Sequence, residues 1–371
     1  MSSATEGLVP MDVAGRADRL RAAMARAEVP ALLVTSLTSI RYLTGFTGSA
    51  ALLVVTDAGL TFVTDGRYGQ QAEAQLGAAG VGATIEVASA GQRELVAGAV
   101  GAARPGALGL EAEAVTWAAQ RTYAESWFPG LELVPTTGLV AELRLVKDDG
   151  EIARLERAAA IADAALAEVR HRLAERPTEV EFGLELDAAM RRLGADDVSF
   201  ETIVASGPNG ALPHHRPSDR TIVEGDLVVL DFGALVDGYH SDMTRTVAVG
   251  DISPTQQRMW DVVRASQAAG VAAVDAGVEA RAVDAACREV IAEAGWEDAF
   301  LHGTGHGVGL DIHEDPRVAK TSAATLVERC VVTVEPGVYL PEHGGVRIED
   351  TVVVTDGGCR PITLTPKNAA V

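Results

Sequence analysis

Isolated acidic residues stand in apolar stretches of the second half of the chain. Asp231 and Glu335 each end a short apolar run, and Glu349 lies inside a third such run, Val346 to Val354. A carboxylate buried in a strand of this kind needs a hydrogen-bonding partner or a metal ion. These three acids are therefore candidate metal ligands.

A fourth acid is brought near Asp231 by the expected chain geometry. The dipeptide Asp237-Gly238 is typical of a two-residue hairpin turn, which would place Gly233 opposite Asp242. Because side chains alternate along a strand, Asp231 then becomes a diagonal neighbour of Asp242, with backbones roughly 7–8 Å apart. Two such carboxylates could bind metal ions between them, and Gly233, which has no side chain, leaves space for those ions. An ordinary surface hairpin is the alternative, but the flanking sequence is too apolar for it.

Three histidines lie among four glycines within twelve residues, at His302, His306 and His313. Glycine permits close approach of the backbone. Histidine is the commonest metal ligand and a near-neutral acid or base. A single histidine is usually structural, whereas this cluster indicates a site.

Four carboxylates with an imidazole form a mostly oxygen-donating set, which suits Mn²⁺, Co²⁺ or Zn²⁺ better than a soft ion. Two divalent cations would neutralise four negative charges, which would otherwise repel one another and be driven to protonate. Paired ions roughly 3.5–4 Å apart activate a water molecule for hydrolysis. In the expected strand Arg347 shares a face with Glu349 and can flank and orient it.

The elements that carry these residues follow an N-terminal region of a different pattern. A chain of 371 residues predicts two domains. Apolar runs at Ala31 to Val34, Ala51 to Val55 and Leu60 to Val63 alternate with helical patterns such as Arg16 to Ala27. This alternation predicts a layered α/β domain.

The pattern changes near residue 147. Glu151 to Leu173 follows a helical period and ends before Pro177, and a second helix is predicted from Thr178 to Leu193. From Phe200 onward β patterns dominate, interrupted by one helical region, Thr255 to Ala294. We therefore expect domains at residues 1–146 and 147–371.

Composition excludes several partners. The net charge of −21 disfavours nucleic acid and anionic membrane surfaces. No apolar run reaches the ~18 residues of a membrane span, and the first ten residues lack the basic and apolar pattern of a secretory signal. The three cysteines, without CxxC spacing, favour a reducing cytoplasm over a disulfide framework.

Together these motifs resemble the pita-bread metallopeptidases, specifically the Xaa-Pro dipeptidase (prolidase) and aminopeptidase P branch. Two N-terminal segments, Ile40 to Phe46 and Asp65 to Tyr68, are similar to that branch's creatinase-like domain. The motifs of the second half are Leu230-Asp-Phe-Gly233, Ser241-Asp-Met-Thr-Arg-Thr246, Gly305-His-Gly-Val-Gly309, Val334-Glu-Pro-Gly-Val-Tyr339 and Val346-Arg-Ile-Glu-Asp350. The resemblance implies an α/β N-terminal creatinase-like domain and an α+β pita-bread C-terminal catalytic domain.

The resemblance also implies which residues bind metal. Asp242 and Glu349 would bridge two divalent ions, which we expect to be Mn²⁺, with Co²⁺ or Zn²⁺ possible. Asp231 would hold one ion, and His306 with Glu335 would hold the other. A homodimer, in which the N-terminal domain helps to wall the partner's site, is a further implication.

Catalytic roles follow from the same resemblance. An activated water attacks the scissile carbonyl, and Glu335 relays its proton to the proline nitrogen. His313 and His214 would hydrogen-bond the substrate and the developing oxyanion. His302 matches a further family histidine, and Tyr339 is a candidate for lining the proline pocket.

Arg317 bears on the length of the expected substrate, a small proline-containing peptide. It lies four residues after His313, where an arginine of the dipeptidase branch grips the free C-terminal carboxylate. A solvated surface arginine is the alternative. With Tyr339 and Arg347, Arg317 completes the candidate substrate-binding residues. A prolidase is therefore predicted, with an aminopeptidase P acting on longer peptides as the alternative.

Other functions remain open at this stage. A methionine aminopeptidase would share the ligands but would not need this N-terminal domain. A creatinase-like, metal-free hydrolase would lack the ligands. A binding protein that has lost activity is disfavoured by the intact ligands. A metal-dependent lyase or esterase remains possible because fold alone does not determine the reaction.

Overall fold

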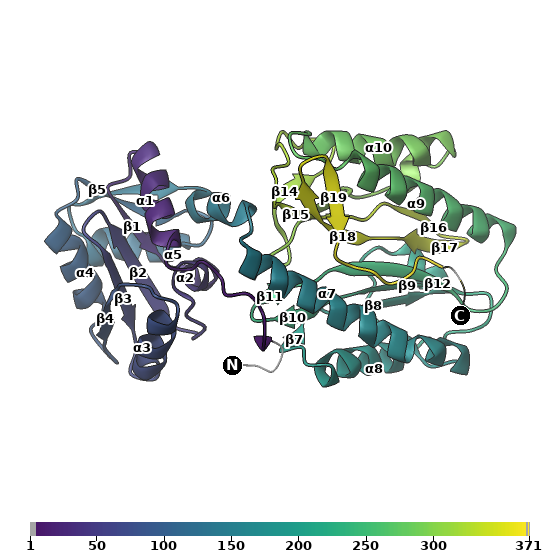
Figure 1. The fold of residues 1–371 in the computed structure, drawn as a ribbon, viewed down its shortest axis with the longest axis horizontal. Helices are drawn as coiled ribbons and strands as arrows, with labels where there is room; N and C mark the ends of the chain where they lie inside the picture. Colours follow the sequence, from purple (N-terminus) through teal and green to yellow (C-terminus); the bar gives the residue numbers. More distant parts are fainter. Residues whose placement is uncertain (1–4, 369, 371) are drawn as a thin grey trace. The chain divides into compact units, whose positions relative to one another are not determined.

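A computed structural model describes residues 5–368 and residue 370. The chain forms two compact units (Figure 1), residues 11–144 and residues 145–371, and the described residues up to Pro10 group with the second unit. In that unit Val9 accepts a hydrogen bond of 3.0 Å from Arg154. Among the described residues, no helix is both long and apolar enough to cross a bilayer.

The first unit is built on a six-stranded sheet with the order β4-β3-β2-β1-β5-β6. Its strands are β1 (Ala31–Val34), β2 (Ala51–Thr56), β3 (Leu60–Thr64), β4 (Thr84–Val87), β5 (Ala107–Glu111) and β6 (Glu132–Thr136). Its helices are α1 (Arg16–Arg26), α2 (Leu37–Thr44), α3 (Gly69–Ala78), α4 (Gln92–Ala103), α5 (Trp117–Thr122), the π-helical turn η2 (Tyr123–Trp127) and α6 (Leu139–Leu145). β1 is buried along its whole length, as its unbroken apolar sequence predicts.

Four long helices frame the second unit, α7 (Asp149–Val169), α8 (Glu179–Arg192), α9 (Pro254–Ala273) and α10 (Ala280–Glu293). Capping boxes at Asp148, Thr178 and Ser253 begin three of them. The predicted helix to Leu173 ends its α-helical part at Val169 and continues as a 3₁₀ turn, η3 (Arg170–Glu175). The single helical region predicted at 255–294 is two helices, because Gly277 adopts a positive φ of 88° between them.

The strands of the second unit form several small sheets. One holds β8 (Ile203–Ser206), β9 (Leu227–Phe232) and β12 (Met243–Ala248), and another holds β7 (Asp197–Val198), β10 (Ala234–Val236) and β11 (Tyr239–His240). The largest contains β13 (Gly305–Gly307), β14 (Glu314–Val318), β15 (Val331–Val334), β18 (Asp350–Thr355) and β19 (Gly358–Pro361). β16 (Gly337–Leu340) pairs with β17 (Gly344–Arg347), and short turns η4 (Gly207–Ala211) and η5 (Glu297–Ala299) complete the unit.

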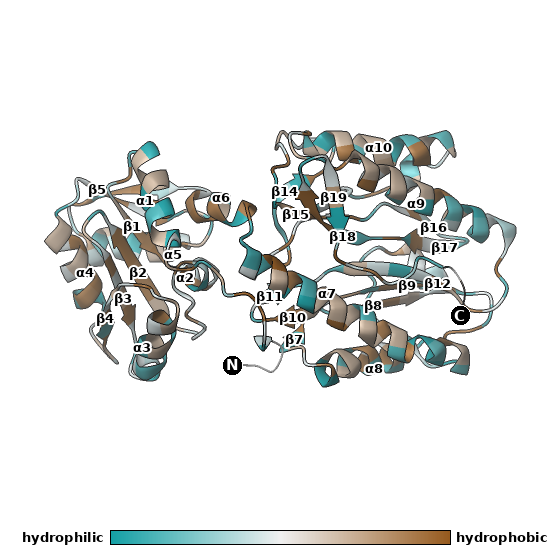
Figure 2. Ribbon diagram, viewed as in Figure 1, coloured by the Kyte–Doolittle hydropathy of each residue, from teal (hydrophilic) through white to brown (hydrophobic). Residues whose placement is uncertain are grey.

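Two hydrophobic cores support these sheets from opposite sides (Figure 1). Residues of α7 and α8 pack against β8, β9, β10 and β12. Residues of α9 and α10 pack against β14, β15, β16, β17 and β18. The strands are coloured as mainly hydrophobic in Figure 2, whereas the helices also carry hydrophilic residues. The strand ends between the two helix pairs are thereby held on rigid supports.

The hairpin expected at Asp237-Gly238 is present. Val236 pairs with Tyr239, and both turn residues have positive φ, 48° and 75°, as a type I′ turn requires. The same register continues into β9 and β12, where Asp231 pairs with Thr244. A Cβ atom on Gly233 would overlap the carbonyl oxygen of Ser241, so glycine is needed where the chain passes from β9 to β10.

The continuous strand expected from Val346 to Val354 is interrupted. β17 ends at Arg347 and β18 begins at Asp350 in a different sheet, with Glu349 between them. Glu349 donates its backbone N–H to Thr244 in β12 over 3.1 Å. This break brings the Glu349 carboxylate beside the strand that follows Asp242.

The Gly233 contact makes a testable prediction. Gly233→Ala should lower the free energy of unfolding by about 1–3 kcal/mol, because backbone overlap cannot be relieved by a rotamer change. Gly183→Ala in α8 is the matched control, since its new methyl would lie 3.5 Å from Val204. That variant should gain about 0.5–1 kcal/mol from helix propensity. Urea denaturation of both proteins compares them, and a Gly233→Ala protein as stable as Gly183→Ala would contradict the predicted overlap.

Candidate active site

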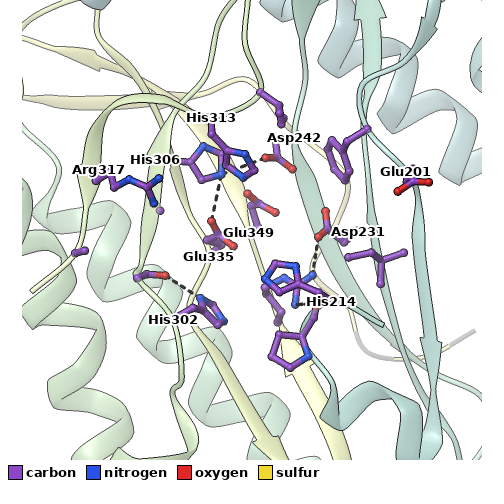
Figure 3. A pocket seen from close by; sticks show the side chains of 18 of the residues that line it. Glu201, His214, Asp231, Asp242, His302, His306, His313, Arg317, Glu335 and Glu349 are labelled. Carbon is purple, nitrogen blue, oxygen red and sulfur yellow. Dashed lines mark hydrogen bonds and ion pairs between the residues drawn. The ribbon is translucent and has the colours of Figure 1, made fainter. Parts of the chain in front are cut away.

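Three carboxylates converge where strands of the two halves of the second unit meet. Asp231 lies on β9, Asp242 directly precedes β12 and Glu349 directly precedes β18. One oxygen from each lies within 4.8 Å of the others. Figure 3 shows them pointing toward one shared space.

His306 and Glu335 complete the cluster from β13 and the end of β15. Nε2 of His306 lies 3.5 Å from Oδ2 of Asp242 and 3.5 Å from Oε1 of Glu335. Nδ1 of His306 donates to the carbonyl of Gly307 over 3.0 Å, which leaves the Nε2 lone pair directed at the acids. The structure thus brings together all five residues expected to bind metal.

Burial and mutual repulsion disfavour ionisation within this cluster. Burial is the main reason that the pKa values of Asp242 and Glu349 lie well above their ordinary range, and the neighbouring carboxylates raise them further. Burial raises the pKa of Glu335 to about 8, although Arg347 opposes the rise. Burial lowers the pKa of His306 to about 4, so the imidazole is neutral and able to ligate. Positive charge is therefore needed to hold all the acids ionised.

The residues present fit divalent metal ions. Oδ1 of Asp231 and Oε1 of Glu349 are buried and lack a hydrogen-bond partner within the described part of the chain. Such atoms are costly to bury unless something else binds them. Four carboxylates and one neutral imidazole match the oxygen- and nitrogen-rich coordination of Mn²⁺, Co²⁺ and Zn²⁺.

Arg347 occupies a different place from the one expected. Its guanidinium forms an ion pair of 2.6 Å with Asp231, and its Nε donates to Thr244 over 3.1 Å. Thr244 in turn donates to Glu349 over 2.7 Å. The expectation that Arg347 flanks Glu349 directly is corrected, because the break after β17 turns the arginine toward β9. It orients Asp231 directly and Glu349 through a hydroxyl.

Tyr339 does not line the cavity, contrary to its expected place in the proline pocket. Its side chain is buried, and its hydroxyl accepts from Arg347 over 2.9 Å and donates to Nε2 of His302 over 2.8 Å. Nδ1 of His302 donates to Gly303, so both ring nitrogens of this histidine are bonded to the protein. Burial lowers its pKa to about 4. His302 is therefore a neutral side chain that lines the cavity and is fixed by hydrogen bonds at both ring nitrogens.

A cavity of about 470 Å³ opens over the cluster. His214, His313 and Arg317 line it, as expected for substrate-binding groups. The ring of His313 lies 4.3 Å from that of His306, between centroids. Burial lowers the pKa of His313, and the nearby Arg317 lowers it further.

The cavity is also lined by residues that the sequence analysis did not identify. Phe200 and Ile312 supply apolar surface, and Glu201 forms an ion pair with Arg216 at the rim. None of these four residues belongs to a recognisable motif. Arg216 stands two residues after His214, which was the one signal in the sequence that could have suggested it.

Comparison with known proteins identifies the family of this chain. Residues 153–356 match the model of metallopeptidase family M24, and residues 16–146 match the creatinase/prolidase N-terminal domain. An uncharacterised peptidase, YqhT of Bacillus subtilis, is 42% identical over 95% of this chain and 99% of its own. An Xaa-Pro dipeptidase structure from Bacillus anthracis has a TM-score of 0.92 at 40% identity, covering 97% of this chain and 100% of that one. An X-Pro aminopeptidase structure from Thermotoga maritima has a TM-score of 0.87 at 32% identity, covering 94% and 100%.

These findings define a metallopeptidase with a creatinase-like domain followed by a pita-bread catalytic domain, which confirms the fold class inferred from the motifs. The chain belongs to metallopeptidase family M24. Membership of this family implies divalent metal ions. The match over residues 16–146 disfavours the methionine aminopeptidase alternative, which would not need that domain.

Replacing Glu349 and Asp350, two adjacent buried acids, by their amides should change the stability of the metal-free protein in opposite directions. Because the folded-state pKa of Glu349 is raised, its stabilising contribution is present in acid and is lost as pH rises through that pKa. Glu349→Gln should therefore raise the melting temperature of the metal-free protein by a few degrees at pH 8. The gain should shrink toward pH 5, where the wild-type carboxyl holds its proton. Calorimetry of chelator-treated protein measures both values.

Asp350→Asn is the matched control. Burial raises the pKa of Asp350, but Arg245 and Lys367 outweigh that effect and leave the pKa lowered. Removing this charge leaves Arg245 buried without its partner and should cost about 3–5 kcal/mol. If Glu349→Gln destabilises the metal-free protein at pH 8 as Asp350→Asn does, ionising Glu349 in this buried cluster does not cost stability as predicted.

Proposed function

We propose that this protein is an Xaa-Pro dipeptidase that cleaves the bond between an N-terminal residue and a following proline. The observation that carries the proposal is Arg317, which lines the cavity above the acidic cluster. A guanidinium there can hold the free carboxylate of a dipeptide through two parallel hydrogen bonds. The Bacillus anthracis structure, named as an Xaa-Pro dipeptidase, supports the same assignment.

Asp231, Asp242, His306, Glu335 and Glu349 would hold two divalent ions, of which Mn²⁺ fits this oxygen-rich set. When bound, these ions supply Lewis acidity and an activated water. Asp231, Asp242 and Glu349 each offer an oxygen within 4.8 Å of the other two, so all three could contribute to holding the ions. Arg347 keeps the Asp231 carboxylate oriented through their ion pair of 2.6 Å.

Glu335 is the group proposed to carry the proton. Its carboxyl lines the cavity, with Oε1 3.5 Å from Nε2 of His306. It takes a proton from the attacking water and delivers it to the proline nitrogen, which must be protonated to leave. Its contact with Thr333, 3.3 Å from Oε1, helps to keep the carboxyl in place.

The substrate is held by groups around the opening. His313 and His214 are proposed to donate hydrogen bonds to the scissile carbonyl as negative charge develops on its oxygen. Phe200 and Ile312 offer apolar surface for the proline ring in place of Tyr339. The cytoplasmic location and the homodimer inferred from the sequence stay predictions.

An aminopeptidase P activity on longer peptides is the second candidate. A neighbouring cavity of about 450 Å³ shares Arg317 and Ala319 with the first. Residues beyond the proline could extend into it if the exposed Arg317 side chain moved aside. The X-Pro aminopeptidase of Thermotoga maritima, similar over 94% of this chain, favours keeping this alternative.

Hydrolysis of matched Xaa-Pro and Xaa-Pro-Yaa peptides tests the two candidates. Chelator-stripped protein should be inactive, and added Mn²⁺ should restore cleavage of the dipeptide. Cleavage of the longer peptide at a similar rate would assign aminopeptidase P activity instead. Loss of both activities despite full metal loading would favour a lyase, an esterase or an inactive protein on this fold.

Arg317→Ala should lower kcat/KM for the dipeptide much more than for the tripeptide. Charged hydrogen bonds of about 1.5–3 kcal/mol correspond to a loss of roughly 10–100-fold in kcat/KM, mainly through KM. The matched tripeptide should change little, because its carboxylate lies one residue further on. Arg216→Ala removes an equal charge from the cavity rim and is the control, which should affect both peptides alike. Equal effects of Arg317→Ala on the two peptides would remove the basis for the dipeptidase assignment.

A further inference from the structure

The segment that carries His214 has little regular structure of its own. It begins with the short 3₁₀ turn η4 at Gly207 and runs to Ser218 without a strand. His214 nevertheless reaches the cavity, near Asp231 in Figure 3. A side chain on such a segment needs external anchors to hold its position.

One anchor is a fully buried carboxylate outside the cavity. Glu179 is the first residue of α8 and is 0% exposed. Its oxygens accept hydrogen bonds from Ser206 (N, 2.7 Å; Oγ, 2.6 Å), Asn209 (Nδ2, 3.0 and 3.1 Å), His215 (Nε2, 2.9 Å) and Ser218 (N, 3.0 Å; Oγ, 2.6 Å). Ser206 directly precedes the segment, Asn209 lies near its start, and His215 and Ser218 lie toward its end.

The charge on Glu179 is part of this arrangement. Burial by itself raises the pKa of the carboxyl, but hydrogen bonds from Ser206 and Ser218 outweigh burial and lower it to about 2. The acid is therefore ionised at neutral pH. Its position in the first turn of α8 also suits a negative charge. Hydrogen bonds to an ionised acceptor are stronger than those to a neutral one.

A second anchor lies on the other side of His214. Arg347, which pairs with Asp231, donates to the carbonyl of Pro213 over 3.3 Å. Glu179 holds His215. His214 therefore stands between two anchored neighbours, one tied to the metal-ligand cluster and one tied to α8.

We propose that Glu179 is a positioning residue that fixes His214 in the active site by holding His215 and both ends of the 207–218 segment. This inference rests on the proposed function, in which His214 contacts the scissile carbonyl. Glu179 itself lies outside the cavity lining and touches no substrate. The competing possibility is that Glu179 merely joins α8 to β8 and contributes to stability alone.

A double-mutant cycle separates these possibilities. In manganese-loaded protein, Glu179→Gln should reduce kcat for an Xaa-Pro dipeptide by roughly 10–100-fold, with metal content unchanged. In a His214→Ala background the same substitution should have little further effect, because the residue it positions is gone. If the two losses multiply, Glu179 does not act through His214.

Two further variants control for folding. Ser218→Ala removes one hydroxyl donor and keeps the buried charge, so it should give a smaller loss that also vanishes in the His214→Ala background. Glu181→Gln lies two residues along α8 at the surface, where its carboxylate caps Thr178. It removes an equal charge and should leave kcat unchanged. A loss in Glu181→Gln equal to that in Glu179→Gln would assign the effect to helix stability.

A readout independent of activity distinguishes failure of this inference from failure of the proposed function. The chain has eight histidines, so spectra of zinc-loaded protein with ¹³C-labelled histidine are simple to assign with His214→Ala. Glu179→Gln should shift or broaden the His214 signal and leave that of His313 unchanged. An unaltered His214 signal would overturn the positioning role, whether or not the protein cleaves Xaa-Pro bonds.

Discussion

The burial of several carboxylates side by side is the constraint on which the catalytic unit depends. Asp242 and Glu349 are almost fully buried beside Asp231 and Glu335, and their raised pKa values record the cost of ionising them together. Arg347 supplies one positive charge against this group. Divalent ions would supply the rest and convert mutual repulsion into attraction. Because the acids do not attract one another, the packing of the surrounding elements must hold them close together.

That packing comes from two helix pairs, each covering strands with an apolar face. The strands meet through hydrogen bonds between β12 and the β17–β18 region, including Thr246 with Arg347 and Thr351 with the carbonyl of Asp242. These buried contacts fix the spacing of ligands that lie more than a hundred residues apart. Glycine at position 233 allows the backbones to approach where a larger side chain would overlap.

Hydrogen bonds to the backbone set the chemistry of the histidines in a similar way. The Gly307 carbonyl directs one nitrogen of His306 toward the acids, and His302 has both nitrogens occupied. Histidines in one glycine-rich segment thereby acquire different roles. His214 depends instead on contacts made by its neighbours, Pro213 and His215.

From the sequence by itself, the Asp-Gly turn predicted the β9–β12 hairpin register and the isolated acids predicted a carboxylate cluster, because both are local signals. The resemblance in motifs, rather than any local pattern, singled out His306 among the three histidines as a proposed ligand. Only the tertiary structure decided that Arg347 pairs with Asp231, that Tyr339 is buried behind His302, and that Glu179 holds the His214 segment. These contacts join residues from separate elements, and strand alternation failed where the chain changes sheets at Ile348. Side-chain partners across such distances are chosen by packing, which no local pattern encodes.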